Sequence, residues 1–137
     1  MKKRTKVLIV EDEMPLALLM VNILTRVHCD VTVATSGRKA MEIAKENQFD
    51  LITLDVELPD TTGYEVCRQL KERHISWKTP IIFIACSPCP EDAAEAKKHG
   101  AVDYLPKPFE VTELIYKVIF YGRAQRLVSQ EKEGLTA

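Results

Sequence analysis

The sequence predicts an α/β fold, a doubly wound parallel sheet of five strands with order 2-1-3-4-5 and helices on both faces. Five short apolar runs of strand length alternate with five segments whose apolar residues recur at helical spacing. A length of 137 residues, without a G-x-G-x-x-G turn, suits a five-unit domain better than the six-stranded dinucleotide fold. Right-handed crossovers leave few other topologies.

The first two units occupy the N-terminal third of the chain. The run Lys6–Val10 is almost entirely apolar, which indicates a strand buried on both faces of a parallel sheet. Pro15 suits the first turn of the helix that follows, whose apolar residues keep the i, i+3, i+4 spacing. Val31–Thr35 is the second expected strand, and Ser36 can cap the second helix.

The third and fourth units are also a strand followed by a helix. "DLITLD" ends at Asp55 and precedes a helix from Gly63 to about residue 73. "IIFIA", Ile81–Ala85, precedes the helix "PEDAAEAKKHG", which carries acids in its first turn and bases near its end, as the helix dipole favours. Gly100 is expected to end that helix.

The fifth unit begins with the strand Val102–Leu105 and continues, after two prolines, as a helix over 109–121. Val111 is expected on the inward face of this helix. The last residues lose the apolar periodicity of a core helix. We therefore expect one domain over 1–121, with a flavodoxin-like strand order, and a helical extension or linker over 122–137.

Charge and hydropathy restrict the classes of partner. A formal net charge of -1 and a pI of about 6.3 provide no basic field for nucleic acid or an anionic membrane surface, so we expect neither partner for this domain. Met14–Leu24 is too short to span a bilayer, and Val7–Val10 is too short for a signal-peptide core. We expect a cytoplasmic protein with reduced thiols at Cys29, Cys67, Cys86 and Cys89.

Acidic residues follow two of the expected strands. Glu11 and Asp12 come after the first strand and Asp55 ends the third, while Lys107 follows the fifth. The carboxyl ends of parallel strands share one rim, where open sheets bind ligands. Carboxylates brought together there repel one another by roughly a few kcal/mol per pair, so they need a cation. Mg²⁺ suits oxygen ligands, and Lys107 supplies a second, fixed positive charge.

Three segments together resemble the receiver domain of two-component response regulators, the CheY-like superfamily, over Lys6 to Tyr121. "VEDE" resembles the family's acidic pair, and "LDVELPDTTG" resembles its phosphoacceptor segment, in which Pro and Gly follow the Asp at fixed distances. "YLPKPF" resembles the signature of the fifth strand, with Tyr104 as the aromatic switch residue. In this family the Lys-Pro bond is typically cis, which we expect for Lys107-Pro108.

The resemblance implies a phosphorylation-dependent signalling module of a two-component phosphorelay, which is not an enzyme with substrate turnover. Asp55 would accept a phosphoryl group from a phosphohistidine, and Lys107 would contact the phosphoryl oxygens. The implied Mg²⁺ ligands are Asp12, Asp55 and the backbone carbonyl of Glu57, with Glu11 acting through water.

The resemblance also implies partners. A histidine kinase or a histidine phosphotransfer domain would dock near the first helix. An output partner would bind the surface made by the fourth helix (residues 90–100), the fifth strand (102–105) and the fifth helix (109–121). A second copy of the chain, forming a homodimer, is a further partner that the resemblance allows.

One position departs from the family pattern. The spacing from both Asp55 and Lys107 puts Ala85 where a Thr or Ser is usual, so the hydroxyl that binds the phosphoryl group is missing. We expect phosphorylation to persist and its coupling to Tyr104 to be weakened or rewired. The alternative is a pseudo-receiver that binds proteins without switching. A haloacid dehalogenase-type phosphatase would place a second Asp where this chain has Glu57.

Cys86 and Cys89 form a C-x-x-C motif. A redox pair is one interpretation, because a thiol at a helix start has a lowered pKa. A thioredoxin-like motif, however, follows the first strand of its βαβ unit, and a zinc site would need two more ligands. Incidental small residues are therefore the third interpretation, and the sequence leaves the three open.

Overall fold

The computed structural model describes residues 4–136, except 74, 76–77 and 87–89. The strands are β1 (Thr5–Val10), β2 (Cys29–Ala34), β3 (Leu51–Asp55), β4 (Ile81–Ala85) and β5 (Asp103–Pro106). The helices are α1 (Met14–Arg26), α2 (Gly37–Glu46), α3 (Gly63–Glu72), α4 (Pro90–Lys98) and α5 (Val111–Thr136). Each helix follows the strand of its number, as the alternation predicts.

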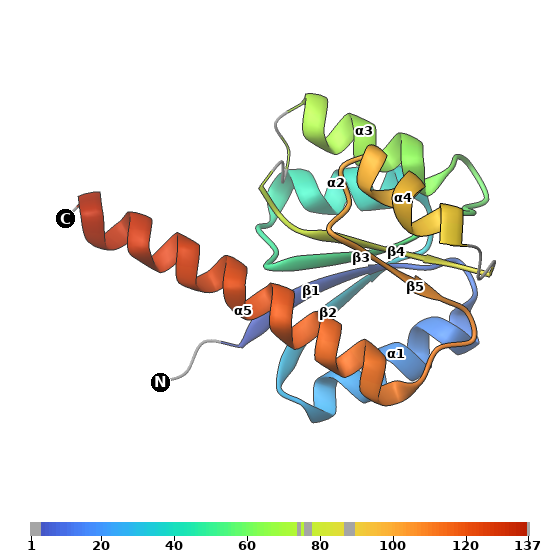
Figure 1. Ribbon diagram of the computed structural model, residues 1–137, viewed down its shortest axis with the longest axis horizontal. Coiled ribbons are helices and arrows are strands. Elements are labelled where there is room, and N and C mark those ends of the chain that lie inside the picture. The colour runs from blue at the N-terminus through green and yellow to red at the C-terminus, as the bar shows by residue number, and fades with distance from the viewer. Residues whose placement is uncertain (1–3, 74, 76–77, 87–89, 137) are drawn as a thin grey trace.

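The five strands form one parallel sheet with order β2-β1-β3-β4-β5, which confirms the predicted topology. Figure 1 shows α2, α3 and α4 on one side of the sheet and α1 and α5 on the other. All five residues of β3 are buried, because helices cover this central strand on both faces.

Two apolar layers hold the helices on the sheet. One layer includes Leu8, Leu54 and Phe83 and lies under α2, α3 and α4. The other includes Ile9 and Leu51 and lies under α1 and α5. Alternate residues of β1 thus serve opposite layers, because successive side chains of a strand point to opposite faces.

The helix ends follow the local signals. The Ser36 hydroxyl accepts a hydrogen bond from the Lys39 amide at 3.1 Å, which confirms the predicted cap of α2. Gly100 follows α4 at φ +96°, a conformation that favours glycine at the end of a helix. The prediction that Val111 faces inward is wrong: its side chain is exposed in the first turn of α5, while Leu114 and Val118 are buried.

Helix α5 continues without a break from Val111 to Thr136, so residues 122–136 prolong the helix that packs on the sheet. In Figure 1 its C-terminal part extends away from the sheet. Gly122 permits a close crossing, because a Cβ there would lie 2.6 Å from the Thr5 methyl carbon. Among the described residues, no helix is long and apolar enough to cross a membrane.

Candidate functional site

The carboxyl ends of the strands bring the predicted site residues to one rim. Glu11 and Asp12 follow β1, and Asp55 is the last residue of β3, the strand beside it. Lys107 follows β5, and its amide donates to the Ala85 carbonyl at 2.7 Å, which joins it to the end of β4. Parallel register therefore assembles residues that are distant in the sequence.

The three predicted carboxylates form a tight cluster. One oxygen from each of Glu11, Asp12 and Asp55 lies within 4.8 Å of the others. Glu11 is 1% exposed and Asp55 is 6% exposed, whereas Asp12 faces solvent. Such a cluster of hard oxygen donors, partly open to water, fits a divalent cation that retains water ligands.

Lys107 lies between two of these carboxylates. Its Nζ is 2.7 Å from Oε1 of Glu11 and 3.0 Å from Oδ2 of Asp55. Burial acts to lower the pKa of Lys107, but its contacts with the two carboxylates outweigh burial and hold that pKa above its ordinary value. The lysine is therefore a permanent positive charge at the rim.

The carboxyl group of Glu11 has a pKa far from its ordinary value. Burial raises the pKa of Glu11 to about 7, with Asp55 adding to the rise and Lys107 opposing it. Its Oε2 accepts a hydrogen bond from the Glu13 amide at 3.2 Å. Among the described residues, its buried Oε1 has the ionic contact with Lys107 but no hydrogen bond of regular geometry. That oxygen therefore retains capacity for a metal-bound water.

The loop after β3 orients Asp55. The Glu57 amide donates to Oδ1 of Asp55 at 3.0 Å, while Oδ2 contacts Lys107. The Gly63 amide donates to the Val56 carbonyl at 2.7 Å, and a Cβ on Gly63 would lie 2.4 Å from the Asp55 carbonyl oxygen. The glycine thus lets α3 begin directly against the end of β3.

A cleft of about 380 Å³ opens over the cluster, and its wall includes Asp12, Asp55, Ala85, Cys86 and Lys107. Ala85 lies at the end of β4 without a hydroxyl, as its spacing predicts. Cys86 is exposed, and Cys89 lies outside the described residues, so the redox pair stays a prediction.

Tyr104, on β5, is half-buried against the layer under α4, and its carbonyl accepts a hydrogen bond from Lys117 at 3.4 Å. Lys107-Pro108 is cis, as expected.

Tyr64 also lines the cleft, and the sequence reasoning missed it. Its ring stacks on His99 with centroids 4.4 Å apart and meets Phe83 edge-on at 5.1 Å. His99 follows α4, so the stack links the cleft to the end of that helix. The sequence signal is slight: an aromatic residue directly after Gly63.

The family model of the response regulator receiver domain matches residues 7–119. The chain belongs to this family. Among curated relatives of this receiver domain, the response regulator ArlR of Staphylococcus saprophyticus is 39% identical over 114 residues, covering 83% of this chain and 50% of the relative. ArlR of Staphylococcus haemolyticus is 37% identical, with coverage of 83% and 51%. The chain therefore spans about half the length of these relatives.

Solved structures of receiver domains share this fold. The receiver domain of the Francisella response regulator 1452 has a TM-score of 0.83 at 30% identity, covering 88% of this chain and 98% of that chain. The receiver domain of the sensor histidine kinase PA1611 from Pseudomonas aeruginosa has a TM-score of 0.79 at 26% identity, with the same coverage, and its active-site cleft holds a magnesium ion.

Proposed function

We propose that Asp55 accepts a phosphoryl group from a phosphohistidine of a partner kinase. The observation that carries this proposal is the ion pair between Asp55 and Lys107 inside a cluster of three carboxylates. An Asp55 oxygen attacks phosphorus, the phosphorus–nitrogen bond breaks, and the released imidazole takes up a proton. Lys107 then moves from the carboxylate to the phosphoryl oxygens, where its charge stabilises the transferred group.

We assign three direct ligands to Mg²⁺: Asp12, Asp55 and the backbone carbonyl of Glu57. Glu11 acts through a water molecule. When bound, the ion neutralises charge on the phosphoryl group during transfer. The close contacts among the carboxylate oxygens support this assignment, as does Oε1 of Glu11, which has an ionic contact with Lys107 but no hydrogen bond of regular geometry. The Glu57 side chain is exposed at the mouth of the cleft.

The test is intact-mass analysis after incubation with acetyl phosphate, with and without Mg²⁺. We expect the wild-type chain to gain the mass of one phosphoryl group in a Mg²⁺-dependent reaction, and Asp55→Asn to gain none. Asp60→Asn is the matched control, because Asp60 lies on the same loop but caps α2. Equal phosphorylation of wild type and Asp55→Asn would contradict the proposal.

Ala85 favours a second candidate, a pseudo-receiver that binds proteins without switching. Our proposal differs: Asp55 is phosphorylated, but its coupling to Tyr104 is weak. Beryllofluoride, a phosphoryl mimic, should shift NMR signals around Asp55 in the wild-type chain and leave Tyr104 short of a full inward rotation. Ala85→Thr restores the hydroxyl and should increase the response of Tyr104. A full rotation in the wild-type chain would contradict weak coupling, and failure to acquire any phosphoryl group would favour the pseudo-receiver.

A histidine kinase or phosphotransfer domain is the partner that we propose at α1. Leu18 and Leu19, together with Met14, are exposed on this helix next to the rim, and Leu18 is 58% exposed. These side chains offer apolar surface beside the phosphoacceptor. Transfer to Asp55 followed by slow self-hydrolysis is the whole of the chemistry that we assign to the chain.

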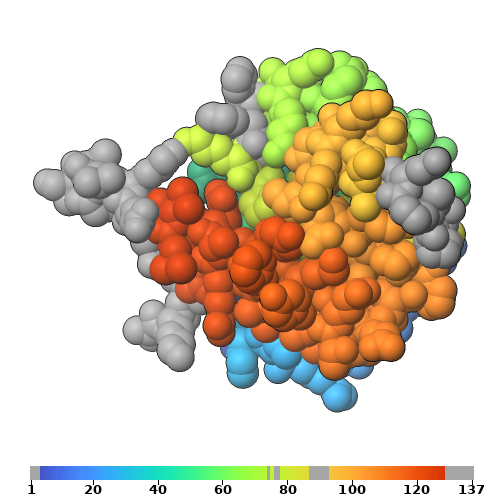
Figure 2. Space-filling model, in the orientation of Figure 1, coloured from blue at the N-terminus to red at the C-terminus, as the bar shows by residue number. Residues whose placement is uncertain are grey.

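An output partner, or a second copy in a homodimer, is proposed at the face made by α4, β5 and α5. Figure 2 shows α4 and α5 both exposed on the face turned to the viewer. Tyr116 is 68% exposed and stacks on Phe120 with ring centroids 6.0 Å apart. On the same helix, Lys117 and Tyr121 both bind the carboxylate of Asp103 at 2.9 Å, which joins α5 to β5.

A further inference from the structure

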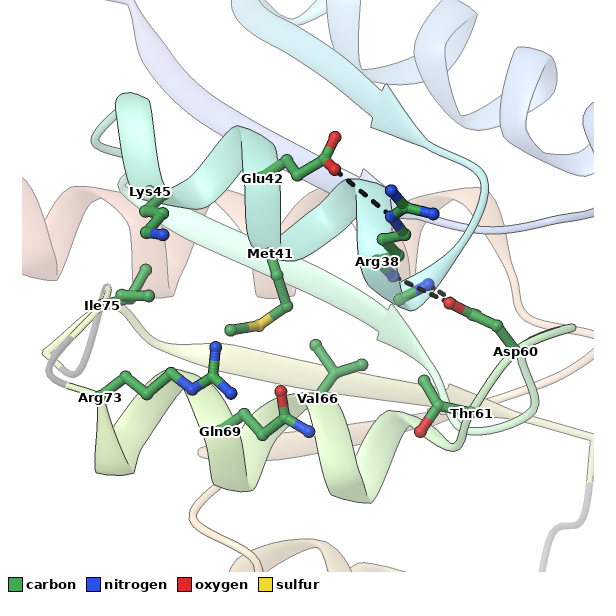
Figure 3. Close-up of a pocket in the computed structure, with 11 residues that line it drawn as sticks. Arg38, Met41, Glu42, Lys45, Asp60, Thr61, Val66, Gln69, Arg73 and Ile75 are labelled. Atoms are coloured by element: carbon green, nitrogen blue, oxygen red, sulfur yellow. Dashed lines mark hydrogen bonds and ion pairs between the residues drawn. The ribbon is translucent and has the colours of Figure 1, made fainter.

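A second hollow lies between α2 and α3, away from the phosphorylation cleft. Its volume is about 470 Å³, within the range typical of small-molecule sites. Figure 3 shows Met41 reaching from α2 into the middle of the groove and Val66 facing it from α3. Together with Ile75, these side chains provide an apolar floor.

Most charges along the groove are already neutralised. Arg38 pairs with Glu42 at 3.5 Å. Both oxygens of Asp60 accept backbone amides at the start of α2, those of Gly37 and Arg38, each at 2.9 Å. The charges of these groups are therefore compensated by contacts within the protein, and they contribute little to the binding of a charged ligand.

Lys45 and Arg73 are different. Across the described parts of the chain, neither side chain has a hydrogen bond or an ion pair. They come from opposite walls, at the ends of α2 and α3, and Figure 3 shows both at the same end of the groove. The helix dipoles stabilise a positive charge at these C-terminal positions. The N–H groups of both side chains remain available as hydrogen-bond donors to a ligand.

We propose that this groove binds a small aromatic anion, meaning a planar apolar body that carries a carboxylate, sulfonate or phosphate group. The body lies on Met41 and Val66, and the anionic group lies between Lys45 and Arg73. Thr61 lies at the opposite end of the groove from these cations, near Asp60, whose carboxylate is held by two backbone amides of α2, so the two unpaired cations share one end of the site. The proposal is independent of phosphorylation.

The test is a titration with 8-anilinonaphthalene-1-sulfonate, followed by NMR of the methionine methyl groups in the whole chain. The Met41 signal should move and saturate, and Met41→Leu assigns it. The double variant Lys45→Gln, Arg73→Gln should weaken binding at this site by about tenfold or more, because two charge-assisted contacts are lost. Lys39→Gln, on an exposed part of α2 that does not line the groove, is the matched control.

A neutral probe separates charge from apolar binding. N-phenyl-1-naphthylamine has the same ring system without the sulfonate and should bind the groove more weakly. The proposal is overturned if the Met41 signal does not move, if the double variant binds the sulfonate as well as wild type does, or if both probes bind equally. It is also overturned if an acidic peptide moves the signal and the sulfonate does not. No phosphodonor is present, so none of these results bears on phosphorylation of Asp55.

Discussion

The ammonium of Lys107 lies 3.0 Å from Oδ2 of Asp55, although 52 residues separate them in the sequence. Their side chains are 13% and 8% exposed, so the ion pair is largely shielded from water. The ends of β3 and β5, on either side of β4, hold the two residues at this separation. The pair therefore fixes the positions of both side chains at the rim.

Replacing Lys107 by methionine should lower the free energy of unfolding by about 3 kcal/mol in metal-free buffer, because two carboxylates lose the cation that compensates them. Mg²⁺ affinity should rise on the order of tenfold, since a positive charge beside the ion has been removed. Urea unfolding and calorimetric titration measure the two effects. Lys98→Met, on an exposed part of α4, should change neither quantity. Unchanged Mg²⁺ affinity in Lys107→Met would contradict the prediction.

The stability of the metal-free protein should decrease as pH rises from about 4.5 to 7, because of Glu11. Its pKa is raised to about 7 in the fold, from 4.5 in the unfolded chain. The folded state therefore holds its proton more tightly in this window, and burying the charged form costs stability above it. Glu11→Gln should remove this part of the pH dependence, seen in Tm against pH. Glu13→Gln, which is exposed, should retain it, and an unaltered profile in Glu11→Gln would contradict the assignment.

Gly63→Ala should destabilise the fold by about 2 kcal/mol or more and reduce phosphorylation of Asp55. A Cβ there would lie 2.4 Å from a backbone oxygen of Asp55, and backbone cannot yield as a side chain can. Gly122→Ala is the control, since its nearest atom belongs to the Thr5 side chain. Thermal unfolding and intact-mass analysis measure the two effects. Equal costs in both variants would argue against a special role for the close approach at Asp55.

Tyr64→Leu should lower the free energy of unfolding by about 1 kcal/mol, because the ring loses its stack on His99 and its edge contact with Phe83. Tyr116→Leu also removes a stacked ring, but on the exposed face of α5, and should cost much less. Chemical denaturation compares the two variants. A larger loss in Tyr116→Leu would show that the stack at the cleft is not the stabilising contact.

The sequence was sufficient for the fold and for the location of the site. Alternation of apolar runs with helical periodicity determines the order of elements, and crossover handedness then restricts the topology. The meeting of Glu11, Asp12 and Asp55 was predictable because the ends of parallel strands share one rim. The position of Ala85 at the end of β4 was predictable from the apolar run that it ends, and the expectation of a hydroxyl there came from the family resemblance.

The tertiary structure decided which atoms meet. Glu11 is buried beside Lys107, while Asp12 is exposed to solvent. This difference depends on how side chains pack at the rim. Two adjacent acids in a sequence do not show which of them will be buried. The Tyr64–His99 stack and the groove with Lys45 and Arg73 arise because separate helices lie side by side on the sheet. Periodicity states which face of a helix is buried, but only packing between helices sets which of their exposed side chains share a groove.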